Sequence, residues 1–185
     1  SFLSQPWFAT VSGTLALTKT GTGTLILRPP GANLYGGGTI ISNGVVELET
    51  TSAGSVLGNP SINDAGLGTG PVTLYNGGIL QLDGWGGSTT PTYGSFPNAI
   101  IVPTNQVGVI RVPCRVNQGP NGTVTGSGTL YIAAQFVRCW TFANFSGFTG
   151  TIVITNSGAD GDNLGLNNNA GMPNARVFVG TFANG

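Results

Sequence analysis

The sequence predicts an all-β fold built as a parallel β-helix, and three observations support that prediction. Short strand–turn–strand units recur at intervals of roughly 20–25 residues, which is typical of solenoid architectures. Glycine makes up 32 of the 185 residues, so turns that need positive φ are frequent. Thr, Asn, Ser, Val and Ile dominate the remainder, without an amphipathic helical pattern. About seven to nine coils are expected, with a β-sandwich or β-prism as the alternative.

Alternation of apolar and polar residues predicts the individual strands. In the first half of the chain they are residues 13–18, 23–28, 38–41, 45–49, 71–75 and 79–82. In the second half they are residues 99–102, 107–112, 123–126, 129–133, 136–141, 150–155 and 175–179. Asn43-Gly44 and Asn76-Gly77-Gly78 lie between such runs. They are either tight hairpin turns or corners between successive faces of a coil, and the sequence leaves both open.

A turn-rich stretch divides the chain without separating it into two units. We expect solenoid coils over residues 1–83, a connecting loop over residues 84–98, and further coils over residues 99–185. These parts form one continuous domain. Neither end carries an evident polar cap, and the first residues lack the basic start and apolar core of a signal peptide. We therefore expect a segment of a longer protein, or a unit that stacks end to end with others.

The composition excludes several classes of function. Charged residues are only 6% of the chain, the net charge is zero and 39% of residues are hydrophobic, so the chain should fold. The six basic residues are scattered and form no patch for phosphates, so nucleic acid is not an expected partner. No apolar run is long enough to insert this segment into a membrane as a helix. Without histidine, no metal site and no cofactor are expected.

The first half of the chain resembles the autotransporter-associated β-strand repeat. The resemblance rests on Gly31-Ala-Asn-Leu-Tyr-Gly-Gly-Gly-Thr-Ile-Ile-Ser-Asn-Gly-Val-Val-Glu-Leu48 and on the stretches 17–27 and 67–82. It covers about residues 11–83, and Leu34 stands where that family commonly has Thr. The resemblance implies a right-handed parallel β-helix, secretion to the cell surface, and a role as the shaft of a large adhesin. It brings no catalytic residue with it.

Carboxylate pairs are the main candidates for catalysis. Glu47 and Glu49 lie two residues apart and would point to one face of a strand, as a polysaccharide hydrolase or lyase needs. The alternative is a solvated face opposite Val46 and Leu48, and with no histidine and one lysine we expect no enzyme. Asp160 and Asp162 are spaced like the first calcium ligands of an EF-hand, but Leu164 breaks that pattern.

Aromatic residues and cysteines supply the other candidate sites. Trp85, Tyr93 and Phe96 in the connecting loop could stack on sugar rings, whereas structural packing is the alternative. A second aromatic group, for which we predict core packing inside the coil, consists of Trp140, Phe142, Phe145 and Phe148. Cys114 and Cys139 are separated by about one coil and are either a disulfide or two buried thiols.

The function expected from the sequence is that of an extracellular structural or adhesive β-solenoid segment. It would serve as a stiff stalk or as a building block of a cell-surface protein or fibre, in contact with neighbouring segments or with copies of itself. A polysaccharide-binding module is the first alternative, with surface glycans as partners. Part of a polysaccharide-degrading enzyme is the second.

Overall fold

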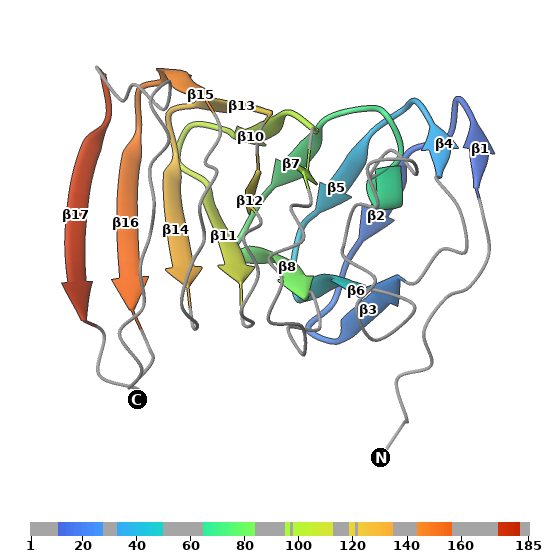
Figure 1. The fold of residues 1–185 in the computed structure, drawn as a ribbon, viewed down its shortest axis with the longest axis horizontal. Helices are drawn as coiled ribbons and strands as arrows, with labels where there is room; N and C mark the ends of the chain where they lie inside the picture. Colours follow the sequence, from blue (N-terminus) through green and yellow to red (C-terminus); the bar gives the residue numbers. More distant parts are fainter. Residues whose placement is uncertain are drawn as a thin grey trace.

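The structure is a computed structural model that describes residues 11–27, 33–49, 65–83, 95–96, 98–112, 119–120, 122–134, 144–156 and 174–181. The described strands stack side by side as a parallel β-helix, with the N-terminal coils at the right of Figure 1 and the C-terminal coils at the left. Every described strand pair is parallel, which excludes the β-sandwich alternative because sandwiches are built from antiparallel sheets.

Two long sheets form two faces of the coils. The seven-stranded sheet consists, in spatial order, of β17 (Arg176–Thr181), β16 (Thr151–Asn156), β14 (Thr129–Ala134), β11 (Val107–Val112), β8 (Gly78–Asp83), β6 (Val45–Glu49) and β3 (Thr24–Leu27). The six-stranded sheet consists of β15 (Asn144–Phe148), β13 (Thr123–Gly126), β10 (Ile100–Val102), β7 (Val72–Leu74), β5 (Thr39–Ile41) and β2 (Leu17–Lys19).

Two short sheets and one helical turn complete the described structure. β1 (Ser12–Gly13) pairs with β4 (Leu34–Tyr35), and β9 (Ser95–Phe96) pairs with β12 (Gly119–Pro120). A three-residue 3₁₀ helix, η1 (Ala65–Leu67), precedes β7. The described residues contain no helix with the length and apolar character of a membrane span.

Register is kept from coil to coil along the seven-stranded sheet, and this places chemically similar residues in rows. Along one such row Val46 pairs with Leu80, Leu80 with Ile110, and Ile110 with Ile132, and all four side chains are fully buried. Because side chains alternate across a strand, this row faces the interior while its sequence neighbours face outward. The hydrophobic core is therefore a continuous stack along the axis, and each coil buries its apolar side chains against the next.

The two Asn-Gly steps are corners between faces and not hairpin turns. Asn43-Gly44 separates β5 from β6, and Asn76-Gly77 separates β7 from β8; in each case the two strands belong to different sheets. Gly44 and Gly77 have φ of 69° and 78°, and Asn76 itself has φ of 49°. Residues without this left-handed preference would be strained there, which explains the recurrence of Asn and Gly.

A β-bulge explains how two phenylalanines three residues apart both enter the core. Between β13 and β15, Thr123 pairs with Asn144 but Thr125 pairs with Gly147, so β15 carries one extra residue. The extra residue reverses the alternation, and Phe145 and Phe148 are both fully buried. Their rings meet edge to face with centroids 6.5 Å apart. The predicted core packing is confirmed for these two residues, while Trp140 and Phe142 lie outside the described residues.

Most predicted strands agree with the structure to within one or two residues. The single strand predicted over residues 13–18 is wrong, because the chain leaves the strand conformation after Gly13, whose φ is 98°, and resumes pairing at Leu17. Four of the strands in the described part of the chain were not predicted: β4, β9, β12 and β15. The prediction over residues 136–141 lies outside the described residues.

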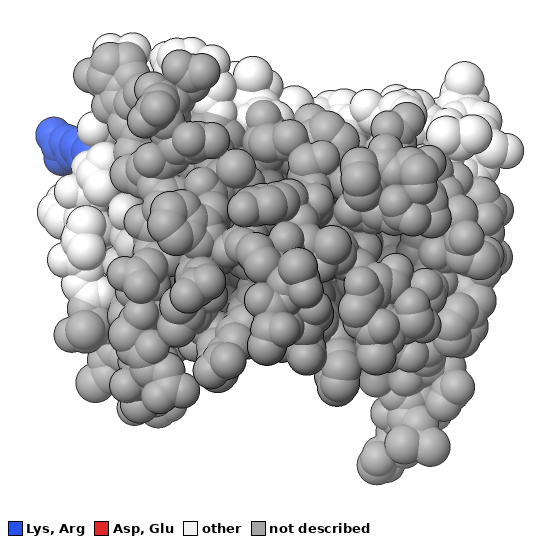
Figure 2. All heavy atoms as spheres, in the orientation of Figure 1, with Lys and Arg blue, Asp and Glu red and all other residues white. Residues whose placement is uncertain are grey.

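Little charge appears among the described residues on the side of the molecule drawn in Figure 2. In Figure 2 the described residues of the drawn side lie along its upper and left edges, and nearly all of them are uncharged. One basic group stands at the left edge, the end at which β17 lies in Figure 1. This agrees with a chain in which only 6% of residues carry charge.

Candidate functional site

An apolar row crosses the outer face of the seven-stranded sheet. The outer row, as we call it, lies at one ladder position and consists of Val45, Ile79, Val109, Tyr131, Val153 and Phe178. The first five side chains are partly exposed, and Phe178 on the outermost strand is 57% exposed. Neighbouring strands are about 4.8 Å apart, so Tyr131 and Phe178 stand about 10 Å apart along the row. This flat, partly aromatic strip can contact an extended molecule.

A polar row runs beside it at the next outward position. Glu47 pairs with Gln81, and Gln81 pairs with Arg111. The Arg111 guanidinium donates a hydrogen bond from one Nη to Gln81 Oε1 at 3.1 Å. Val46 and Leu48 on either side of Glu47 are 0% and 2% exposed, so Glu47 points away from the core as predicted. Glu49 pairs with Asp83 through the backbone, and the side chains of those two residues are not described.

Most of the site residues predicted from the sequence lie outside the described residues. This holds for Trp85, Tyr93, Cys114, Cys139, Asp160 and Asp162. For Phe96 the structure describes the backbone, which pairs with Pro120 between β9 and β12, but not the side chain. Sugar stacking by the connecting loop and a bond between the two cysteines therefore stay predictions.

The outer row was not recognised in the sequence, although a signal was present. In β14, Leu130 and Ile132 are fully buried, and Tyr131 between them must point outward. The same alternation in β16 and β17 would have placed Val153 and Phe178 outward as well. The sequence does not show which residues on adjacent coils pair with each other, because the paired residues are more than 20 positions apart in the chain.

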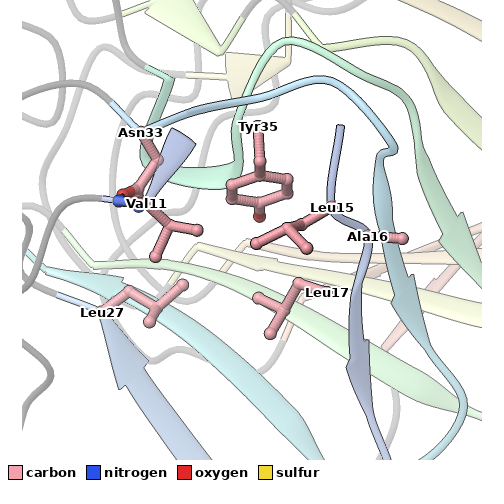
Figure 3. A pocket seen from close by; sticks show the side chains of 7 residues that line it. All are labelled: Val11, Leu15, Ala16, Leu17, Leu27, Asn33 and Tyr35. Carbon is pink, nitrogen blue, oxygen red and sulfur yellow. The ribbon is translucent and has the colours of Figure 1, made fainter. Parts of the chain in front are cut away.

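A cavity of about 170 Å³ opens at the N-terminal end of the solenoid (Figure 3). Its walls are mostly aliphatic, with one amide and one phenol, and consist of Val11, Leu15, Ala16, Leu17, Leu27, Asn33 and Tyr35. Leu15 is 59% exposed at the rim, whereas Tyr35 is 2% exposed. An apolar cavity of this size can accept a group about as large as a benzene ring.

The polar groups that line this cavity are engaged within the protein. Asn33 Oδ1 accepts a hydrogen bond from the Val11 amide at 2.7 Å, and Asn33 Nδ2 donates to the Gly66 carbonyl at 2.8 Å. The Tyr35 and Thr39 hydroxyls are hydrogen-bonded at 2.6 Å, and Thr39 Oγ1 donates to the Leu67 carbonyl at 3.4 Å. These bonds join three coils, so their first role is to fix the coils in register.

Removing the Tyr35 hydroxyl is expected to change how stability depends on pH. Burial raises the pKa of Tyr35 above its ordinary value of 10.0, and the Thr39 hydrogen bond opposes that shift. The folded state thus holds this proton more tightly than the unfolded state, so its contribution is complete below pH 10 and disappears as the pH rises through the folded pKa. Urea unfolding of Tyr35→Phe should show a shallower loss of stability above pH 10 than the wild type. If the free energy of unfolding fell equally steeply above pH 10 in the wild type and in Tyr35→Phe, a raised pKa of Tyr35 would be contradicted.

At neutral pH the same substitution is expected to be mild. Tyr35→Phe removes one buried hydrogen bond, and the expected loss is about 0.5–1.5 kcal/mol. Tyr75→Phe is the matched control, because it removes the same hydroxyl group from a side chain that is only partly buried.

Groups that could bind a metal are not clustered in the described part of the chain. Within it, no set of three or more His, Cys, Asp or Glu side chains is placed to hold a metal ion.

Comparison with known families gives one match. Residues 17–48 match the family model described as the passenger-associated-transport-repeat. The matched segment begins at the first residue of β2 and ends one residue before the end of β6, so it contains one complete turn of the β-helix and part of the next. No curated protein and no solved structure matches the chain.

The match agrees with the architecture. The chain is a parallel β-helix, and the family match over residues 17–48 confirms the predicted autotransporter-type repeat in that segment. The repeat suggests an autotransporter passenger domain, and the family implies a secreted or cell-surface protein.

Proposed function

We propose that this chain is an extracellular structural segment, a stiff shaft that sets distance and orientation in a larger cell-surface adhesin. The observation that carries the proposal is the uninterrupted parallel ladder from β3 to β17. Every coil in it is hydrogen-bonded to the next, and the core residues of successive coils lie over one another. A rod built in this way resists bending at every point and needs no binding site.

Removing one complete coil tests this proposal. Thr129 and Thr151 occupy the same ladder position, so deletion of residues 129–150 brings β11 directly against β16, with Val109 opposite Val153. A structural segment is expected to refold and to become about 4.8 Å shorter along its axis. Small-angle scattering measures the length, and amide hydrogen exchange reports whether the ladder re-forms. The deletion itself removes Cys139 and is made with Cys114 replaced by serine; the undeleted chain with both Cys114 and Cys139 replaced by serine is the control.

A polysaccharide-binding module is the second candidate, and the outer row favours it. Tyr131 and Phe178 present two rings on one flat face about 10 Å apart, a spacing that an extended glycan chain can match. The adjacent polar row with Gln81 and Arg111 offers hydrogen-bonding groups to hydroxyls.

A glycan array separates the two candidates. A binding module is retained on at least one glycan and loses that retention in Tyr131→Ala or Trp85→Ala, the latter testing the connecting loop. Val109→Ala is the matched control in the outer row without an aromatic ring. A structural segment gives no retention with any variant. Failure of the coil-deleted chain to fold would count against the shaft, because a spacer must tolerate a change in its number of coils.

If the chain degraded a polysaccharide, both proposed functions would be wrong and the protein would be an enzyme. The direct test is a panel of polysaccharides with the wild type and with Glu47→Gln. Product formation by the wild type and its loss in the variant would establish catalysis at this position.

A further inference from the structure

The two Asn-Gly corners of the described residues differ in how their glycine amides are hydrogen-bonded. Asn43 and Asn76 are both exposed, and each is followed by a glycine with positive φ. The Gly77 amide donates to the Val107 carbonyl of the next coil at 2.8 Å and is thereby part of the ladder. The Gly44 amide donates at 2.7 Å to Oδ1 of Asn43, the side chain immediately before it. The Gly77 amide is therefore bonded to the next coil, whereas the Gly44 amide is bonded to the side chain of the preceding residue.

That contact places two reactive groups together. The side-chain carbon of Asn43, one bond beyond Oδ1, is an amide carbonyl that a nucleophile can attack. The Gly44 nitrogen can form a bond to this carbon and close a five-membered succinimide, while the side-chain nitrogen leaves as ammonia with the amide proton. Water then opens the ring at either carbonyl and gives aspartate or isoaspartate. The sequence of steps consumes one water, releases one ammonia and involves no oxidation.

A lysine from the preceding coil stabilises the charge that this reaction develops. The Gly44 nitrogen attacks after losing its proton, and the resulting negative charge is shared with the Asn43 carbonyl oxygen of the same peptide group. Lys19 Nζ donates to that oxygen at 3.3 Å, and also to the carbonyls of Thr20 at 2.9 Å and Gly21 at 2.7 Å. An ammonium group fixed by three acceptors is already in place when the charge appears. No comparable cation is described beside Asn76.

We propose that Asn43 is a site of spontaneous deamidation and that the Lys19 ammonium accelerates it. Each event adds one negative charge, beside Lys19, to a chain whose net charge is zero. The isoaspartate product also lengthens the backbone at a crowded corner, since a Cβ on Gly44 would lie 2.4 Å from the carbonyl oxygens of Gly21 and Gly23.

The rates at the two corners can be compared within one molecule. The purified chain is incubated at mildly alkaline pH, and peptide mapping by mass spectrometry follows the conversion of Asn43 and Asn76. We expect Asn43 to react about tenfold faster than Asn76 in the folded protein, equivalent to ~1.4 kcal/mol in activation free energy. In chains unfolded by urea the difference should disappear, because it depends on the fold. Equal rates in the folded protein, or faster reaction at Asn76, would overturn the proposal.

Substitution of Lys19 isolates the contribution of its charge. Lys19→Met keeps most of the aliphatic stem but cannot donate, and it is expected to slow conversion of Asn43 about threefold or more while leaving Asn76 unchanged. Lys19→Arg keeps the charge and should restore most of the rate. Amide exchange of β5 and β6 verifies that each variant keeps the corner. An unchanged rate in Lys19→Met would exclude the role of the ammonium.

Discussion

Replacement of Phe148 with alanine is expected to lower the free energy of unfolding by about 3–5 kcal/mol. The Phe148 side chain is fully buried and meets the ring of Phe145 edge to face, so the substitution removes apolar contacts and an aromatic pair together. The bulge in β15 adds to the effect, because a strand that already carries an unpaired residue has few ways to close over a cavity.

The matched control for this substitution is Phe178→Ala. It removes the same number of atoms from a side chain that is 57% exposed on the outermost described strand, and the expected change is within about 0.5–1 kcal/mol. Both variants are measured by urea unfolding, together with amide exchange in β13 and β15, because solenoid coils can open locally. Similar losses for the two variants would mean that β15 does not pack as described.

The substitution Gly126→Ala is expected to cost at least about 3 kcal/mol or to prevent folding. Gly126 has φ of 109°, and a Cβ at this position would lie 2.0 Å from the Val102 carbonyl oxygen of the previous coil. That oxygen accepts hydrogen bonds from the Ser127 and Gly128 amides, so it cannot move away without breaking the corner. The two effects, strain in φ and collision with the backbone, act together here.

Gly77→Ala separates the two effects. Gly77 has φ of 78°, but a Cβ there would find no atom within 4 Å, so the substitution introduces strain alone. We expect a loss of about 1–2 kcal/mol from this variant, measured by the same urea titration. If the two alanine variants were equally stable, close contact between coils at the Gly126 corner would be contradicted.

Several parts of this fold could be predicted from the sequence because they depend on local alternation. In β8, β11 and β14 the buried aliphatic residues Leu80, Leu82, Ile110, Leu130 and Ile132 alternate with outward residues. The predicted ranges 79–82, 107–112 and 129–133 overlap the observed strands almost completely. Glycine at positions such as 44 and 77 marked turns between strands, although not whether each turn is a hairpin or a corner. Each of these features is visible within a window of a few residues.

The features that could not be predicted depend on contacts between coils. β4, β9 and β12 contain two residues each, too few to show a period, and they exist because a neighbouring coil offers a partner. β15 was missed because its bulge hides the alternation between Phe145 and Phe148. The choice between corner and hairpin at Asn43-Gly44 likewise depended on whether the flanking strands pair with each other or with the adjacent coils.

The candidate sites were predictable only in part, for the same reason. Glu47 was correctly placed on an outward face, because Val46 and Leu48 fix the alternation. The outer row and the Lys19 contacts with the Asn43 corner join residues on different coils, and no short window contains both partners.

The coils differ in length, yet the ladder keeps its register. From Leu17 to its partner Thr39 is a step of 22 residues, from Thr39 to Val72 one of 33, and from Val72 to Ile100 one of 28. Further along, Val109, Tyr131 and Val153 follow one another at steps of 22. Extra residues are therefore accommodated between the paired positions, at a closure cost that rises only slowly with length. Such a chain can acquire, lose or exchange inserted sequences one coil at a time. New surface features can therefore evolve while the packing of the core side chains stays the same.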